Sequence, residues 1–343
     1  MQNIKDLDIA ELENKLIELG EKKYRAKQIF KWVHQGVRSF DDMTDLSMTL
    51  RDKLKKEFDL CIYTIIDKQV SKDGTKKYLF QLADKNTIET VLMKYKYGNS
   101  ICVSSQIGCK MGCKFCASSK VKFIRSLTSG EIVEQLLAVT YDIGERISNV
   151  VFMGIGEPFD NYDNVLKAIH IINNPHGLNI GGRHISVSTC GIVPKILQFA
   201  EEGIQSTLSI SLHAPNDNIR KSMMPIAERY SINELIDACK KYTEKTNRRI
   251  TFEYSLVNGV NDTQKDANEL ANLLHGILCH VNLIPVNSIK NGVYTKSSDE
   301  RIQKFRDILD KRRITATVRR ELGSDIEAAC GQLRRDRLKE DII

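Results

Sequence analysis

At 343 residues, of which 41% are apolar, the chain is long enough for one large domain with a buried core and a smaller accessory domain. Lys and Arg number 51 against 44 Asp and Glu, a net charge of +7 that suits a phosphate backbone but also an ordinary solvated surface, so charge alone leaves RNA binding open. No stretch reaches the roughly 18 continuous apolar residues of a membrane span, and residues 1–19 lack the apolar core and cleavage site of a secretory signal, so we expect a cytosolic protein without membrane contact.

Residues 1–60 predict a helical accessory domain. Apolar residues fall at helical spacing in two segments, Ile9, Leu12, Leu16 and Leu19 in the first and Ile29, Phe30, Trp32 and Val33 in the second. The second segment also carries basic residues on or near its polar side: Lys22, Lys23, Arg25, Lys27 and Lys31. That side is either an RNA-facing surface or a solvated one.

Residues 61–100 predict a small antiparallel β unit. The β-like runs are CIYTIIDKQV, KKYLFQLAD, TIETVLMKY and, at the boundary with the next domain, SICVSSQ. The first two are separated by SKDGT, whose Asp-Gly pair is typical of a hairpin turn.

Residues 101–343 predict the main domain, because short apolar runs now alternate with longer helical ones. We count six β-α units, which indicate a parallel sheet or partial barrel, and ITATVR near Thr315 is a candidate for a further strand. In such barrels the chemistry lies at the carboxyl ends of the strands. The unusual residues stand there: a cysteine cluster after the first strand, GIGEP after the second, Ser188 at the third, His213 at the fourth and Asn287 at the sixth.

Cys109, Cys113 and Cys116 form a CxxxCxxC triplet in the loop after the first of these strands. Nine cysteines are an odd and therefore poor disulfide set, which favours metal or redox chemistry. Three thiolates on a [4Fe-4S] cluster leave one iron open to chelate a small molecule. The alternative is a zinc knuckle, which needs a fourth Cys or His, and the next histidine is only at His170.

With this triplet the chain resembles the radical S-adenosylmethionine (SAM) superfamily, and over nearly its whole length it resembles the RlmN-type adenine-C2 methyltransferases of RNA. The resemblance rests on VSSQIG, GCKMGCKFCAS, FMGIGEPFDN, SVSTCGIVP, SISLHAPND, MPI, VNGVND, HVNLIPVN, DIEAACGQL and, near the N-terminus, RAKQIFKWVHQGVRSFDDM. It implies an α/β fold with a partial (β/α)6 radical SAM barrel. A related C8-methylating family shares the cysteines, but its Gly-Glu pair is not usually followed by proline, whereas here Pro158 follows Glu157.

The resemblance implies a reaction that uses two SAM molecules per turnover. One methylates Cys330, and the other, on the cluster, is cleaved to a 5′-deoxyadenosyl radical that takes a hydrogen from the new S-methyl group. The resulting carbon radical adds to adenine C2, Glu89 removes the C2 proton, and Cys102 releases the product by forming a disulfide with Cys330. Without the resemblance, Glu89 is an ordinary strand residue, Cys102 a small buried strand residue and Cys330 a cysteine at a helix start.

The resemblance also implies a SAM site at the carboxyl ends of the strands. Glycines in GIGEP allow the backbone to approach a ligand, and a carboxylate there can accept from the SAM ammonium group. The residues carried over are Gly156, Glu157, Ser188, Ser211, Leu212, His213 and Asn287. A lone glycine-rich turn or a lone histidine is more often structural, and we assign Cys61, Cys190, Cys239 and Cys279 to the structure.

The expected partners follow from the same resemblance. They are 23S rRNA, tRNA methylated next to the anticodon, and an electron donor such as flavodoxin or ferredoxin, with the enzyme acting as a monomer. Two alternatives stay open at this point. One is adenine-C8 methylation, and the other is a non-catalytic, metal-containing RNA-binding protein.

Overall fold

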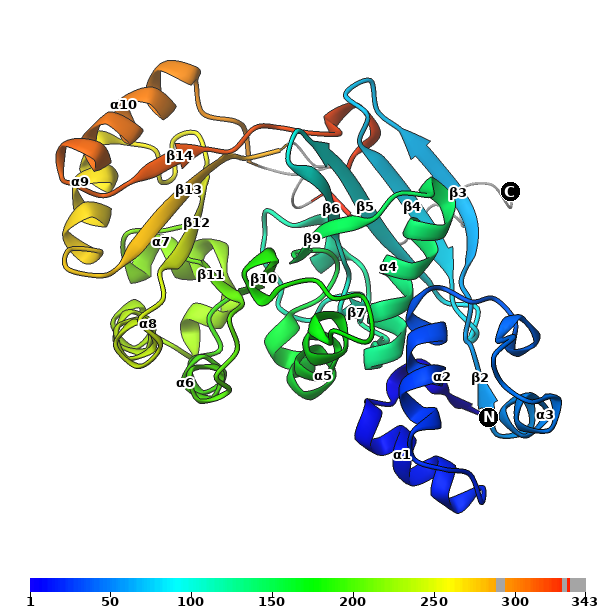
Figure 1. Cartoon of the computed structure of the whole chain (residues 1–343). Helices are drawn as coiled ribbons and strands as arrows, with labels where there is room; N and C mark the ends of the chain where they lie inside the picture. The colour runs from blue at the N-terminus through cyan, green and yellow to red at the C-terminus, as the bar shows by residue number, and fades with distance from the viewer. Residues whose placement is uncertain (288–293, 329–331, 334–343) are drawn as a thin grey trace.

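The computed structural model describes residues 1–287, 294–328 and 332–333. Its centre is one ten-stranded sheet with the order β14-β13-β12-β11-β10-β9-β6-β5-β4-β3. From β6 to β14 neighbouring strands run parallel, and from β3 to β6 they run antiparallel. The antiparallel strands therefore extend the barrel sheet instead of forming a sheet of their own (Figure 1).

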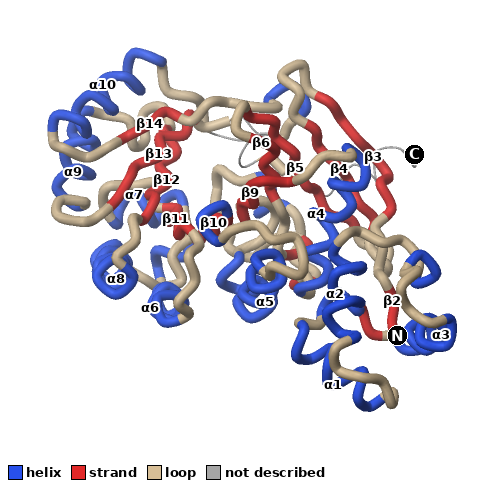
Figure 2. Tube along the Cα trace, viewed as in Figure 1, coloured by secondary structure: helices blue, strands red, loops and turns tan. Residues whose placement is uncertain are grey.

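The parallel part confirms the predicted partial barrel. Its strands are β6 (Gly98–Cys102), β9 (Ile147–Phe152), β10 (Ile185–Thr189), β11 (Thr207–Ser211), β12 (Ile250–Leu256), β13 (Cys279–Pro285) and β14 (Ala316–Val318). The connecting helices are α4 (Ser129–Ile143), α5 (Tyr162–Asn173), α6 (Val193–Glu201), α7 (Asp217–Met223), α8 (Ile232–Thr246), α9 (Gln264–Leu273) and α10 (Asp299–Lys311). The ITATVR segment does add a strand, β14, and the helices lie along the outside of the curved sheet (Figure 2).

The antiparallel part consists of β3 (Thr64–Val70), β4 (Lys76–Gln81) and β5 (Thr87–Tyr95). The predicted hairpin joins β3 to β4, and Gly74 adopts φ +87° in its turn, a conformation that favours glycine. Strand β5 is buried from Thr87 to Met93, because α4 covers one face and the C-terminal part of the chain covers the other. This double burial explains the nearly continuous apolar run of TIETVLMKY.

The accessory helices are α1 (Ile9–Glu18), α2 (Arg25–His34) and α3 (Met48–Glu57), beside the short parallel pair β1 (Gln2–Asn3) and β2 (Phe58–Asp59). They share one hydrophobic core with the barrel. A buried ion pair between Lys5 and Glu134 of α4 also joins the two parts. No helix within the described residues is both long enough and apolar enough to span a membrane.

Candidate active site

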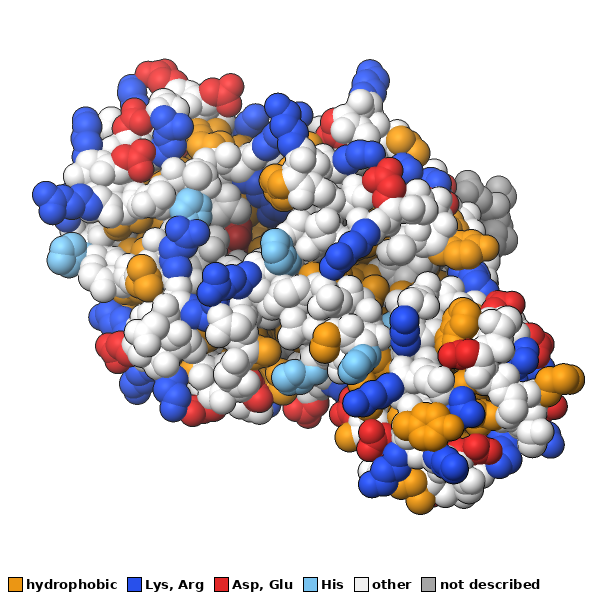
Figure 3. Space-filling view, in the orientation of Figure 1, with side chains coloured by type: hydrophobic (Ala, Val, Ile, Leu, Met, Phe, Trp, Pro, Cys, Tyr) orange, Lys and Arg blue, Asp and Glu red, His pale blue; other side chains and the backbone are white. Residues whose placement is uncertain are grey.

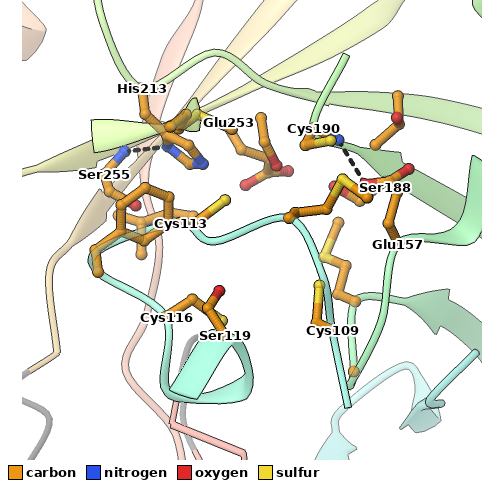
Figure 4. A pocket seen from close by; sticks show the side chains of 18 of the residues that line it. Cys109, Cys113, Cys116, Ser119, Glu157, Ser188, Cys190, His213, Glu253 and Ser255 are labelled. Carbon is orange, nitrogen blue, oxygen red and sulfur yellow. Dashed lines mark hydrogen bonds between the residues drawn. The ribbon is translucent and has the colours of Figure 1, made fainter. Parts of the chain in front are cut away.

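The cysteine triplet lies in the loop between β7 (Gln106–Ile107) and the short helix η3 (Ala117–Lys120). Cys109, Cys113 and Cys116 line one cavity with about 930 Å³ of empty space at the carboxyl ends of the parallel strands. Figure 4 shows their side chains around a common space. Burial raises the pKa of the Cys109 thiol to about 12, so a thiolate there needs a cationic partner, which cluster iron would provide. The described residues contain no group of three or more His, Cys, Asp or Glu placed to hold a single metal ion, so the geometry adds no support for zinc.

Glu157 is the main buried carboxylate on the opposite side of this cavity. Its two oxygens accept hydrogen bonds from the backbone N–H groups of Phe159 at 3.0 Å and Cys190 at 2.8 Å. Burial is the largest influence and raises the pKa of Glu157, so an arriving cation such as an ammonium group would favour its ionised form. Gly156 adopts φ +106°, and a Cβ there would lie 2.6 Å from Cβ of Gln106, so this position needs glycine.

His213 offers a fixed donor to the cavity. Its Nδ1 atom accepts a hydrogen bond of 2.9 Å from the Ser255 backbone N–H, and burial lowers the pKa of the ring to about 3. The ring is therefore neutral, and its proton is on Nε2. The Phe115 ring packs edge-on against it, with the ring centres 4.7 Å apart, so its orientation is set from two sides (Figure 4).

The other residues expected at the SAM site divide into two groups. Ser188, Ser211 and Asn287 line the same cavity as Glu157 and His213. The Leu212 side chain does not line it, because it is fully buried in the hydrophobic core. The backbone N–H of Leu212 donates to the carbonyl of Glu253 at 3.1 Å.

The structure also brings residues to this cavity that the sequence analysis did not select. They include Met111, Phe115, Cys190, Glu253, Ser255 and Arg319. Cys190, which we assigned to the structure, directly follows β10, so the rule about carboxyl ends of strands was the available signal. Glu253 lies inside β12, where it is buried and hydrogen-bonded to Asn282 at 2.7 Å, and no sequence motif marks it.

A second cavity adjoins the first and contains Cys102, the last residue of β6. Its lining is Val91, Met93, Cys102, Cys116, Ser118, Met153, Gly154, Arg319, Ala328 and Leu333. It therefore lies between a residue of the cysteine triplet and residues on both sides of position 330. Leu333 is held here by a 2.8 Å hydrogen bond from the Ser118 hydroxyl to its carbonyl. Cys330 itself lies outside the described residues.

Residues 323–328, which we call the C-terminal strap, are bound to the hairpin turn at residues 71–75. The Ser71 hydroxyl donates to the Asp325 carboxylate at 2.6 Å, and the backbone N–H of Gly323 donates to Asp73 at 2.9 Å. Apolar residues of this C-terminal region, including Ala328 and Leu333, pack on the face of β5 that carries Val91 and Met93. The strap thus approaches the second cavity from the hairpin side.

Glu89 lies on β5, where it is buried. Side chains alternate along a strand, so Glu89 shares its face with Val91 and Met93, which line the cavity of Cys102. Its carboxylate lies 3.7 Å from the ammonium group of Lys77 on β4. The backbone carbonyl of Glu89 accepts a 2.6 Å hydrogen bond from the Ser104 hydroxyl, which fixes this part of the strand near the cavity.

Comparisons with known proteins agree with this site. Residues 103–274 match the model of the radical SAM superfamily, and residues 2–60 match the ribosomal RNA large subunit methyltransferase N-terminal domain. Proteins named as probable dual-specificity RNA methyltransferases RlmN are 54% identical in Clostridium novyi and 56% identical in Caldanaerobacter subterraneus, each over 99% of this chain and 100% of the relative. The crystal structure of a radical SAM methyltransferase from Sphaerobacter thermophilus superposes with a TM-score of 0.94 at 46% identity, covering 98% of this chain and 100% of the other. The chain therefore belongs to the RlmN family within the radical SAM superfamily.

Proposed function

We propose that this protein methylates C2 of adenosine in RNA and that Cys330 carries the methyl group. The observation that carries the proposal is the second cavity, which joins Cys102 to Cys116 and is lined by residues on both sides of position 330. A methyl carrier at this position would be near both the triplet and a second thiol. An RNA-binding metalloprotein without turnover would not need that arrangement.

The residues of the first cavity fit a [4Fe-4S] cluster and SAM. Cys109, Cys113 and Cys116 would hold three irons, and Glu157 would accept from the SAM ammonium group. When bound, the cluster and SAM supply the reductive cleavage that generates a carbon radical. The neutral His213 ring would donate from Nε2 to an acceptor atom of SAM, while Ser188, Ser211 and Asn287 offer further polar contacts.

Three residues of the chain would then act in sequence. Cys330 presents its methyl carbon to adenine C2, and Glu89 accepts the proton that C2 must lose. Cys102 forms an S–S bond to the sulfur of Cys330 as the bond between that sulfur and the transferred carbon breaks. Such a bridge requires Cα atoms about 4.4–6.8 Å apart, a distance that the shared cavity around Cys102 makes reachable.

The RNA substrates are proposed from the relatives, whose names describe dual-specificity RNA methyltransferases. For this chain we propose 23S rRNA and the tRNA adenosine next to the anticodon. The electron would come from a small redox protein such as flavodoxin or ferredoxin. Anaerobic incubation with SAM, a reductant and each RNA, followed by nuclease digestion and mass-resolved nucleosides, tests this proposal. The proposal expects 2-methyladenosine; 8-methyladenosine would identify the C8 reaction, and absence of 5′-deoxyadenosine would indicate a non-catalytic binder.

The cluster can be tested separately from RNA. After anaerobic reconstitution we expect about four iron and four sulfide per chain, and the loss of both with Cys109→Ala, Cys113→Ala or Cys116→Ala. Cys239→Ala is the matched control, because Cys239 is buried in the core away from the cavity and should leave the iron content unchanged. Stoichiometric zinc without iron would contradict the proposal.

The two other cysteines should fail at different stages. Cys330→Ala has no sulfur to methylate, so it should keep the cluster but form neither methylated protein nor methylated RNA. Cys102→Ala should still attack adenine but lack the thiol that resolves the adduct, leaving RNA covalently joined to protein. Denaturing electrophoresis followed by nuclease treatment and peptide mass analysis should place an adenosine on Cys330. Normal turnover of Cys102→Ala, or an adduct on another residue, would disprove the assignment.

A further inference from the structure

Lys77 is a buried cation on the face of β4 that continues the face of Glu89. Its ammonium group and the Glu89 carboxylate are almost fully enclosed, with side chains 6% and 4% exposed, and lie 3.7 Å apart. In the strand register Lys77 faces Val91 and Leu79 faces Glu89, so Lys77 and Glu89 are diagonal neighbours on one face of the sheet. The pair therefore results from the pairing of β4 with β5.

The same ammonium group also contacts the C-terminal strap. Lys77 Nζ donates a hydrogen bond of 3.1 Å to the backbone carbonyl of Glu327. The next residue, Ala328, lines the cavity of Cys102. One buried cation thus lies between the carboxylate on β5 and the strap that leads toward position 330.

A buried charge is costly unless it is paired, so the pair must offset the desolvation of both groups. Lys5 and Glu134 show how a purely structural pair looks in this protein, because they are in direct hydrogen-bond contact between the accessory helices and the barrel. Lys77 and Glu89 differ, since 3.7 Å is too long for a normal hydrogen bond. Lys77 stabilises the ionised carboxylate electrostatically while its printed hydrogen bond goes to the strap.

We propose that Lys77 is a positioning residue for the methylation reaction, holding the Glu89 carboxylate and the strap in one frame. This inference rests on the proposed function, in which Glu89 acts as the base. In the step concerned, the C2–H bond of the adenine adduct breaks, its electron pair stays on the purine ring, and the proton forms an O–H bond with the Glu89 carboxylate. Lys77 keeps that carboxylate ionised in a buried place and aligned with the segment that presents the methyl carbon.

The test compares Lys77→Met with wild-type holoenzyme, using Lys5→Met as the matched control that also breaks a buried Lys–Glu pair. Each reconstituted enzyme is incubated anaerobically with SAM, reductant and tRNA, and 5′-deoxyadenosine and 2-methyladenosine are measured from the same sample. We expect Lys77→Met to keep its cluster and its methylated Cys330, while the yield of 2-methyladenosine per 5′-deoxyadenosine falls by about tenfold or more, as for loss of a well-placed base. Lys77→Arg should restore part of the yield. Lys5→Met should lose thermal stability with an unchanged yield.

Each other outcome has a definite meaning. An unchanged yield in folded Lys77→Met overturns the inference while the proposed function stands, and so does loss of Cys330 methylation in that variant. If the methionine variant does not fold, Lys77→Gln, which keeps a donor without the charge, decides by the same yield. A wild-type enzyme that makes no 2-methyladenosine would instead refute the proposed function itself.

Discussion

Two histidines are held neutral inside the protein. His213 faces the first cavity, and His34 lies at the end of α2 with its ring 4.0 Å from that of Phe30. Burial lowers the pKa of His34 to about 4 and that of His213 to about 3, against a usual value of 6.5. Because the unfolded chain binds these protons and the folded chain does not, their contribution to stability is complete above pH 6.5 and is lost as the pH falls below that value.

We expect the free energy of unfolding to decrease on acidification from pH 7 to pH 5, with His34 alone accounting for about 2 kcal/mol. His34→Gln removes this titration, so its urea midpoint should change less between the two pH values than that of the wild type. His176→Gln is the control, because His176 is exposed. Equal pH dependence in His34→Gln and wild type would show that His34 is not held neutral by the fold.

At the scale of elements, the strap and the hairpin turn depend on one glycine. Gly323 adopts φ +65°, and a Cβ there would lie 2.8 Å from Cβ of Ala328 and 2.9 Å from Cγ2 of Thr75. Thr75 is itself buried, so it has little room to move. A side chain at position 323 would therefore push the strap away from the turn.

Gly323→Ala should weaken RNA methylation by about a hundredfold through misplacement of the strap, while the cluster is retained. Gly20→Ala is matched to it, because Gly20 has φ +73° but nothing within 4 Å of the added Cβ. The control pays only the backbone cost of about 1–2 kcal/mol, measured by thermal unfolding, and should methylate normally. Loss of methylation in both variants would mean that general destabilisation, not the strap, is responsible.

The sequence predicted elements better than it predicted how they meet. Short apolar runs identified the barrel strands, and Asp73-Gly74 identified the hairpin, because both signals are local. The continuity of the sheet across β5 and β6 depends on backbone pairing, which no local pattern specifies. For the same reason the Lys77–Glu89 pair was invisible: the two residues meet only in the register of β4 with β5. Glu253 was missed because its neighbours on adjacent strands, not its own sequence, bring it to the cavity.

At the scale of the whole molecule, the positive charge is dispersed. Figure 3 shows Lys and Arg side chains spread over the visible face, including the accessory helices, and mixed with acidic ones. Lys27 and Lys31 of α2 are exposed, in agreement with the polar side predicted for that helix. They are therefore available to an RNA backbone.

We expect RNA affinity to fall as salt rises, and Lys27→Glu with Lys31→Glu to weaken binding and lower the slope of log affinity against log salt by about two phosphate contacts. Reversal of Lys265 and Lys311, exposed on α9 and α10, gives the same change of net charge at another place and is the control. Fluorescence anisotropy with labelled tRNA measures both. If the two double variants behave alike, the effect is one of net charge and α2 does not contact RNA.

The order of the sheet has a consequence for how the protein is made. From β3 to β14 each strand of the ten-stranded sheet pairs with the strand before it in that sheet, so the ribosome can deliver the strands in the order in which they assemble. The strap reverses this direction, since Asp325 binds Ser71 in the first hairpin, whose turn is synthesised some 250 residues earlier. A chain released early would carry a nearly complete sheet without the strap. We therefore expect the reaction chamber to close only when synthesis is finished, which keeps unfinished chains from acting on RNA.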